Sequence, residues 1–229
     1  LAGPWLAPVD DAFDGSAYYA ARSYSDGERR YLFGWVPTKE DNDDARSWQW
    51  GGTLVVHEVY QRTDGTLGVK PPVGVVNAFA REQSLLDAPV VLATQDSCAS
   101  ASLAANTGGL FKLELQVEFS AGTRAFGVRL CEDEATGAAY EFIFQLGEDR
   151  VSFGKTPSMP LTSYMNKGLE RPLHLAAGRK YTLQIIVDDT IATLCVEGVA
   201  LNTRMYAKPG QALAVYVVDG SLTVDHAAL

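Results

Sequence analysis

Hydrophobic and polar residues alternate along most of the second half of the chain. Apolar residues occupy the odd-numbered positions of 111–119, and the same alternation returns at 140–146, 181–187 and 213–217. Successive side chains of a β-strand point to opposite faces, so this pattern predicts strands with one buried face. Asp-Asp, Glu-Gly and Asp-Gly pairs between these segments are typical of turns. Many short strands and no long helical pattern predict a β-sandwich of jelly-roll or lectin-like type.

The first third of the chain predicts a separate small sheet. Turns or loops join four strand-like segments in sequence: 18–24, 29–35, 52–61 and 66–69. Pro71 and Pro72 end the last strand because neither has an N–H to donate. Propeller blades are four-stranded meanders that stack face to face, and a lone sheet of this kind must pack on something. We predict an all-β chain with a propeller-blade-like sheet in 1–80 and a β-sandwich in 81–229.

The segment between these two regions has a weaker pattern. Residues 79–86 favour a short helix that Pro89 would end, and 90–93 favour a strand. Small residues dominate 97–105. We interpret this segment as a linker that leads into the first strand of the sandwich.

Composition and charge narrow the classes of partner. The 229 residues are 47% hydrophobic, but no apolar run approaches the roughly 18–20 residues that span a bilayer. The net charge of −9 argues against nucleic acid and anionic membranes as partners and leaves neutral partners such as sugars open. No signal peptide is visible at the start, although a secretion signal could have been removed.

The three cysteines are Cys98, Cys131 and Cys195, and no C-x-x-C or C-x-H spacing connects them. An odd number of distant cysteines predicts free, buried thiols rather than a disulfide framework or a metal site. Free thiols slightly favour the cytoplasm, and secretion stays open.

Two features of residues 38–50 allow more than one interpretation. The acidic loop 38–47 is either a calcium loop or a solvated connection, and its spacing fits no Asp-x-Asp-x-Asp-Gly pattern. Trp48 and Trp50 are two residues apart, so on a strand they face the same side. They could stack on sugar rings or belong to the core.

Motifs of common enzymes are missing from the sequence. It has no G-x-S-x-G, no P-loop and no G-x-G-x-x-G, and its three histidines are far apart, so we predict no metal and no cofactor. His57 and Glu58 are adjacent on a predicted strand and point to opposite faces, so they cannot form an acid–base pair. No pair of carboxylates stands out for glycoside hydrolysis. Asp14 precedes an aromatic strand and is either a site residue or a turn residue before Gly15.

Several short motifs occur in order. Asp14 precedes Y-Y-A-A-R at 18–22, followed by R-Y-L-F-G-W, W-G-G and D-G-T-L-G-V-K-P, and V-E-G-V-A-L-N-T-R-M-Y occupies 196–206. Together they resemble the last propeller blade and the C-terminal sandwich of glycoside hydrolase family 32, the invertases, levanases and inulinases. The chain departs from the family pattern at Arg22, where lysine is frequent, and at His57-Glu58, where Pro-Arg is common.

The resemblance implies the C-terminal portion of an enzyme that hydrolyses β-fructosides of the sucrose, levan or inulin type. It implies that Asp14, Tyr19, Arg22 and Trp50 bind substrate at the border of the sugar pocket. The family's catalytic carboxylates lie in W-M-N-D-P-N-G, R-D-P and E-C motifs on earlier blades, and none of these motifs occurs here. We therefore expect no catalytic residue in this chain and no activity of the chain alone.

A non-catalytic carbohydrate-binding or interaction module of the same fold is the alternative. In either case, we expect the sandwich after about residue 105 to buttress the propeller. An isolated blade would expose an apolar face, so we predict that the remaining blades, self-association or the sandwich cover it.

Overall fold

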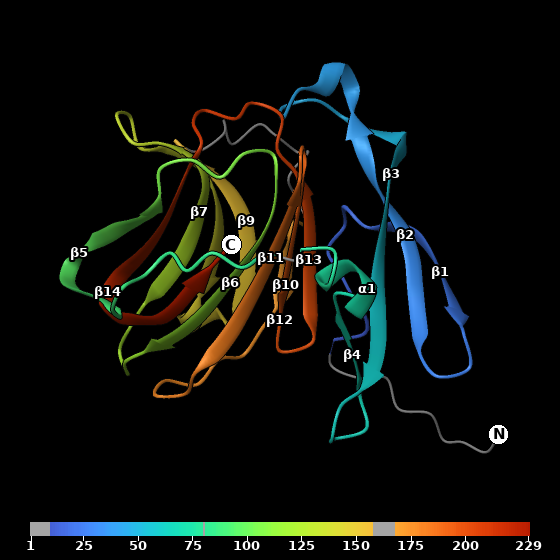
Figure 1. The fold of residues 1–229 in the computed structure, drawn as a ribbon, viewed down its shortest axis with the longest axis horizontal. Coiled ribbons are helices and arrows are strands. Elements are labelled where there is room, and N and C mark those ends of the chain that lie inside the picture. The colour runs from blue at the N-terminus through green and yellow to red at the C-terminus, as the bar shows by residue number, and fades with distance from the viewer. Residues whose placement is uncertain (1–9, 80, 158–167) are drawn as a thin grey trace.

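A four-stranded antiparallel sheet forms the first part of the computed structural model, which describes residues 10–79, 81–157 and 168–229 (Figure 1). Its strands follow one another in the order of the chain: β1 (Tyr19–Ser25), β2 (Arg30–Lys39), β3 (Trp48–Gln61) and β4 (Leu67–Lys70). A short 3-10 turn, Glu40–Asn42, lies between β2 and β3. The predicted blade-like meander is confirmed.

The linker differs from its prediction. The expected helix at 79–86 is wrong: the described residues of that segment contain no helix, and a single helical turn, α1 (Val73–Val76), lies upstream. Pro72 precedes α1 with a φ of −60°, which suits the start of a helix. Residue 83 instead exchanges backbone hydrogen bonds with Leu229, and Ser84 bridges Ala228, so this stretch is held extended.

The second part of the chain forms a larger antiparallel sheet of ten strands that folds over into a sandwich (Figure 1). The strands are β5 (Val90–Ala104), β6 (Leu110–Phe119), β7 (Ala125–Asp133), β8 (Ala138–Gln145), β9 (Arg150–Thr156), β10 (Glu170–Pro172), β11 (Tyr181–Asp188), β12 (Ile191–Val196), β13 (Val199–Arg204) and β14 (Ala212–Ala228). A second 3-10 turn, Leu146–Glu148, connects β8 to β9. The all-β class and the predicted sandwich are confirmed.

Strand β14 connects the two layers of the sandwich. Its first half pairs with β7, its second half pairs with β6, and β5 pairs along both halves. The Asp219-Gly220 pair follows the predicted strand at 213–217 and is of the type expected to form a turn between two strands, but it lies at a bend within this one strand. Gly220 has a φ of +117°, and a Cβ there would lie 2.4 Å from Thr123 Oγ1, so the bend requires glycine.

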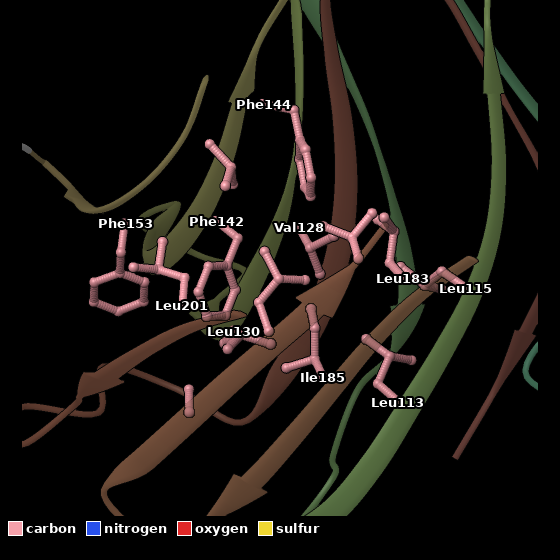
Figure 2. Close-up of a cluster of buried hydrophobic side chains, with 14 of the residues drawn as sticks. Leu113, Leu115, Val128, Leu130, Phe142, Phe144, Phe153, Leu183, Ile185 and Leu201 are labelled. Atoms are coloured by element: carbon pink, nitrogen blue, oxygen red, sulfur yellow. The ribbon is translucent and has the colours of Figure 1, made fainter. Parts of the chain in front are cut away.

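The alternating residues predicted to be buried form the core between the layers (Figure 2). The odd-numbered apolar residues from Phe111 to Phe119 on β6 are buried, as are their counterparts on β11. The rings of Phe126 and Phe144 stack with centroids 4.5 Å apart. Figure 2 shows side chains from β6, β7, β8 and β11 directed at one another, among them Leu113, Leu130, Phe142 and Ile185.

One face of the blade packs against the sandwich. Leu32 and Val36 of β2 and His57 of β3 are buried on this face, and β13 contacts both β2 and β4. The ring of Tyr18 lies so close to Gly34 that a Cβ there would be 2.5 Å from it. The sandwich therefore buttresses the blade from one side only.

Candidate functional site

The opposite face of the blade carries a row of aromatic residues. Tyr31, Phe33 and Trp35 alternate along β2 with the buried residues, so they point away from the sandwich. Each is only partly buried, and every residue of β1 beside them is exposed. This surface, which we call the open face, is where the chain presents aromatic side chains to its surroundings.

A bulge in β1 decides which of the predicted site residues reach the open face. Tyr19 pairs with Trp35 and Arg22 pairs with Phe33, so three steps on β1 match two on β2. Ala20 adopts the left-handed region with a φ of 50°, which is unusual for a residue other than glycine. Without the extra residue, Tyr19 and Arg22 would point to opposite faces. The bulge therefore places both on the open face.

Tyr19 and Trp50 meet at one end of the open face. Their ring centroids are 5.5 Å apart, and the ring of Trp35 lies 5.6 Å from Tyr19. They border a hollow of about 330 Å³, which we call the aromatic pocket, lined by Ser16, Tyr19, Pro37, Trp48, Gln49 and Trp50.

Both tryptophans of β3 line the aromatic pocket. Trp50 is 78% exposed, whereas Trp48 packs partly against the core and lies under the ammonium group of Lys39, 4.6 Å from the ring centroid. Nearby, the indole nitrogen of Trp35 is buried and has no hydrogen-bond partner among the described residues. The core interpretation therefore holds in part for Trp48, and sugar stacking by Trp50 stays a prediction.

Asp14 lies on the sandwich side of the blade, away from the other predicted site residues. Its carboxylate accepts hydrogen bonds from the backbone N–H groups of Gly15 (2.6 Å) and Asn202 (2.7 Å) and from the side-chain amide of Asn202. Its Oδ2 lies 2.8 Å from Nε2 of His57, and both side chains are 1% exposed. In this chain, Asp14 joins the blade to the sandwich, and a contact with sugar stays a prediction.

Asn202 and Thr193 belong to this buried network but were not singled out from the sequence. Thr193 Oγ1 donates to Asn202 Oδ1 at 2.5 Å, so the amide is held by polar partners on both sides. Asn202 lies in the 196–206 motif quoted above, but nothing in that motif indicates a partner 188 positions away. Burial raises the pKa of the neighbouring Tyr18 hydroxyl and Cys195 thiol, and the charge of Asp14 adds to both shifts.

Arg204 forms a second connection between blade and sandwich. From β13, its guanidinium donates to the carbonyl groups of Val36 (2.7 Å) and Pro37 (3.0 Å) and to the hydroxyl of Thr53 (2.9 Å). It also donates to Thr190 Oγ1 at 2.8 Å. Burial lowers the pKa of Arg204 from its usual value, as expected for a cation held mainly by neutral acceptors.

The acidic loop between β2 and β3 is exposed except at Asp44. The Asp44 carboxylate is buried against the sandwich, where it contacts Tyr140 Oη and lies 3.1 Å from Lys155 Nζ. The expectation of a solvated loop is therefore wrong for this residue. Across residues 10–79, 81–157 and 168–229, no group of three or more His, Cys, Asp or Glu side chains could hold a metal ion.

Burial by itself raises the pKa of Asp44, but hydrogen bonds from Tyr140 and Tyr206 and the ion pair with Lys155 outweigh it and lower the pKa. A lowered pKa in the folded state means that ionised Asp44 stabilises the fold above the unfolded pKa of about 3.9. This contribution is lost as the pH falls through the pKa of Asp44 in the folded state.

All three cysteines are free. Cys195 is buried and Cys131 is partly buried, but Cys98 is exposed on β5, so the expectation of buried thiols is wrong for Cys98. Burial raises the pKa of each thiol. None of the described helices has the length and apolar composition required to cross a bilayer.

Neither a protein-family model nor a curated protein sequence matches this chain. Solved structures with the same fold include fructan 1-exohydrolase IIa from Cichorium intybus, with a TM-score of 0.66, 13% identity and coverage of 94% of this chain and 48% of that one. Exo-inulinase from Aspergillus awamori gives a TM-score of 0.64 at 16% identity, with 93% and 42% coverage. A GH32 β-fructofuranosidase from Bombyx mori gives 0.58 at 15% identity, with 94% and 41% coverage.

This chain thus spans less than half the length of each of these proteins. At such low identity, the likeness concerns the fold. Each of these structures matches more than nine-tenths of the chain. The four-stranded sheet and the sandwich, which were predicted above as separate regions, therefore occur together in one known fold. The predicted resemblance is confirmed at that level: the chain has the fold of part of a glycoside hydrolase family 32 β-fructosidase.

Proposed function

We propose that this chain is the C-terminal portion of a GH32-like enzyme that hydrolyses β-fructosides of the sucrose, levan or inulin type. The observation that carries the proposal is the fold likeness, because the matched proteins are by name an inulinase, a fructan exohydrolase and a β-fructofuranosidase. The three acidic motifs of the family are missing from the sequence, so the catalytic carboxylates would come from other blades. The aromatic pocket would contribute to substrate binding.

The chemistry of the aromatic pocket suits a sugar. The exposed rings of Trp50 and Tyr19 offer apolar surfaces on which the C–H groups of a fructosyl unit can pack. Arg22 offers hydrogen-bond donors on the same face, and donors of this kind bind sugar hydroxyl groups. We assign sugar contact to Tyr19, Arg22 and Trp50. Asp14 would act from the opposite side of the sheet, which faces the sandwich.

The partner of the open face would be the remaining blades. Tyr24 and Leu54 are 65% and 61% exposed on this face, beside the partly buried Tyr31, Phe33 and Trp35. Contiguous apolar surface of this kind marks an interaction site. Sheets of a propeller stack face to face, so a neighbouring blade would cover these residues without any change in the sandwich.

The first prediction concerns activity. The chain alone should release no fructose from sucrose, levan or inulin, because it lacks the carboxylates that glycoside hydrolysis requires. The measurement is fructose release by the purified chain, with and without a co-expressed propeller portion that carries the three acidic motifs. Release that appears only with that portion would support the proposal. Release by the chain alone, abolished by Asp14→Asn, would instead show that it carries its own nucleophile.

The second prediction concerns binding. Trp50→Ala should weaken the binding of an inulin-type fructo-oligosaccharide about tenfold or more, because it removes the most exposed ring of the aromatic pocket. Isothermal titration calorimetry measures the change. Tyr24→Ala is the matched control, since it removes an exposed aromatic ring from the other end of β1 and should leave the affinity unchanged.

Calorimetry also separates the two classes of function. A binding module should bind the oligosaccharide equally well alone or with the propeller portion. A portion of an enzyme should bind more tightly when that portion completes the pocket. Equal losses in Trp50→Ala and Tyr24→Ala would show that the aromatic pocket is not the sugar site.

A further inference from the structure

The aromatic pocket is built on the blade, but the loop that leads into it is held by the sandwich. Trp48 is the first residue of β3, and it follows Asp44 by four positions. Asp44 is 6% exposed at its side chain, while its neighbours in the loop are exposed. The loop therefore has one buried anchor immediately before the two tryptophans.

The carboxylate of Asp44 accepts hydrogen bonds from four groups of the sandwich. Asp44 Oδ1 accepts from the backbone N–H of Tyr206 (3.0 Å), and Oδ2 accepts from that of Ala207 (3.3 Å). Oδ2 also accepts from Lys155 Nζ (3.1 Å) and from the hydroxyl of Tyr140. These groups come from β8, β9 and the segment after β13, so the carboxylate holds the loop against several elements at once.

Lys39 completes the connection at the other end of the loop. Its ammonium group donates to the backbone carbonyl of Asp44 at 2.6 Å and lies over the ring of Trp48. Its backbone N–H donates to the hydroxyl of Tyr206 at 2.9 Å. A shift of Asp44 would therefore be passed to Trp48 through Lys39 as well as through the chain itself.

We propose that Asp44 is a positioning residue for the aromatic pocket, through which the sandwich sets the placement of Trp48 and Trp50 and so the affinity for a fructo-oligosaccharide. Asp44 does not line the pocket, so its effect on the ligand would be indirect. The part of the inference that concerns affinity rests on the function proposed above. The part that concerns the placement of the tryptophans does not.

The test uses Asp44→Asn in the full chain. The amide keeps the shape of the side chain but loses the charge that pairs with Lys155, and one of its two ends can no longer accept hydrogen bonds. We expect backbone hydrogen exchange in residues 45–50 to become at least tenfold faster and the affinity for the inulin-type oligosaccharide to fall about tenfold. Tyr140→Phe is a milder second variant that removes one donor and should shift both quantities in the same direction by less.

Val128→Ala serves as the control for a loss of stability alone, because Val128 is buried in the sandwich core on β7. It should lower the melting temperature yet leave exchange in residues 45–50 and the affinity as in the unaltered chain. A merely structural role for Asp44 would make Asp44→Asn behave like Val128→Ala, with the melting temperature reduced and the other two quantities unchanged. That result would overturn the proposal.

The two readouts also separate this inference from the proposed function. If the unaltered chain binds no oligosaccharide, alone or with the co-expressed propeller portion, but exchange in residues 45–50 still accelerates in Asp44→Asn, the positioning role stands and the sugar site is rejected. If affinity falls in Trp50→Ala but neither readout changes in Asp44→Asn or Tyr140→Phe, the sugar site stands and the positioning role is rejected.

Discussion

Replacing His57 by alanine should lower the free energy of unfolding by about 3 kcal/mol, because a buried carboxylate that loses a hydrogen-bond partner carries a penalty of about 1–3 kcal/mol or more, and the lost imidazole ring leaves a cavity. Nε2 of His57 lies 2.8 Å from Oδ2 of Asp14, with 1% of each side chain exposed. Asn202 would still donate to Asp14, but it does not fill the space of the lost imidazole ring. Urea denaturation followed by far-UV circular dichroism measures the loss.

The chain offers a matched control in His174. Its Nδ1 also lies 2.8 Å from an aspartate oxygen, that of Asp149, but these side chains are 76% and 60% exposed. Exposed pairs contribute about 1 kcal/mol or less, so His174→Ala should change stability little. Similar losses in the two variants would show that burial does not give the His57–Asp14 pair its importance.

Replacing Arg204 by methionine should lower the free energy of unfolding of the blade by about 3 kcal/mol, since buried acceptors that lose a donor each carry a penalty of about 1–3 kcal/mol. Methionine keeps much of the apolar stem but cannot donate to the carbonyl groups of Val36 and Pro37. The loss falls on the contact between the two parts of the chain, so we expect the blade to unfold before the sandwich.

The positions of the tryptophans make it possible to measure whether the blade unfolds before the sandwich. All four tryptophans lie within the first 50 residues, so fluorescence reports on the blade region, whereas circular dichroism is dominated by the larger sandwich. In Arg204→Met the fluorescence midpoint should move to lower urea than the circular dichroism midpoint. Arg179→Met is the control, because Arg179 is 62% exposed and pairs with Glu197 at the surface. Coincident midpoints in Arg204→Met would contradict the assigned role.

The sandwich could be predicted because alternation is a local signal. The polarity of each residue from Phe111 to Phe119 indicates which face of the sheet its side chain takes. The pairing register with the neighbouring strands then follows, because the apolar side chains must all face the core. The Asp219-Gly220 pair was misinterpreted because the residues that favour turns also favour a bulge within a strand. The segment 79–86 was misassigned because its apolar residues suit either a short helix or an extended pairing.

Some residues of the candidate site could also be predicted from the sequence, and others could not. Tyr19 and Trp50 could be nominated from motifs in the segments that form β1 and β3, and the structure brings their rings together although β2 lies between these strands. The hydrogen-bond network around Asp14 could not be predicted from the sequence, because Asn202 is 188 positions away. Whether Asn202 meets Asp14 depends on how the sandwich docks on the blade. Arg204 and Asp44 were missed for the same reason: a single polar residue in a motif or loop does not show which distant carbonyl or ammonium group it will meet.

The position of β14 in the chain has a consequence for synthesis on the ribosome. This strand pairs with β5, β6 and β7, and it follows all of them, so Leu213 must find Ala104 across more than a hundred residues. Contacts between residues so distant in sequence form slowly. Until β14 leaves the exit tunnel, the nascent chain presents unpaired strand edges, and such edges are the surfaces that chaperones shield and that aggregates recruit.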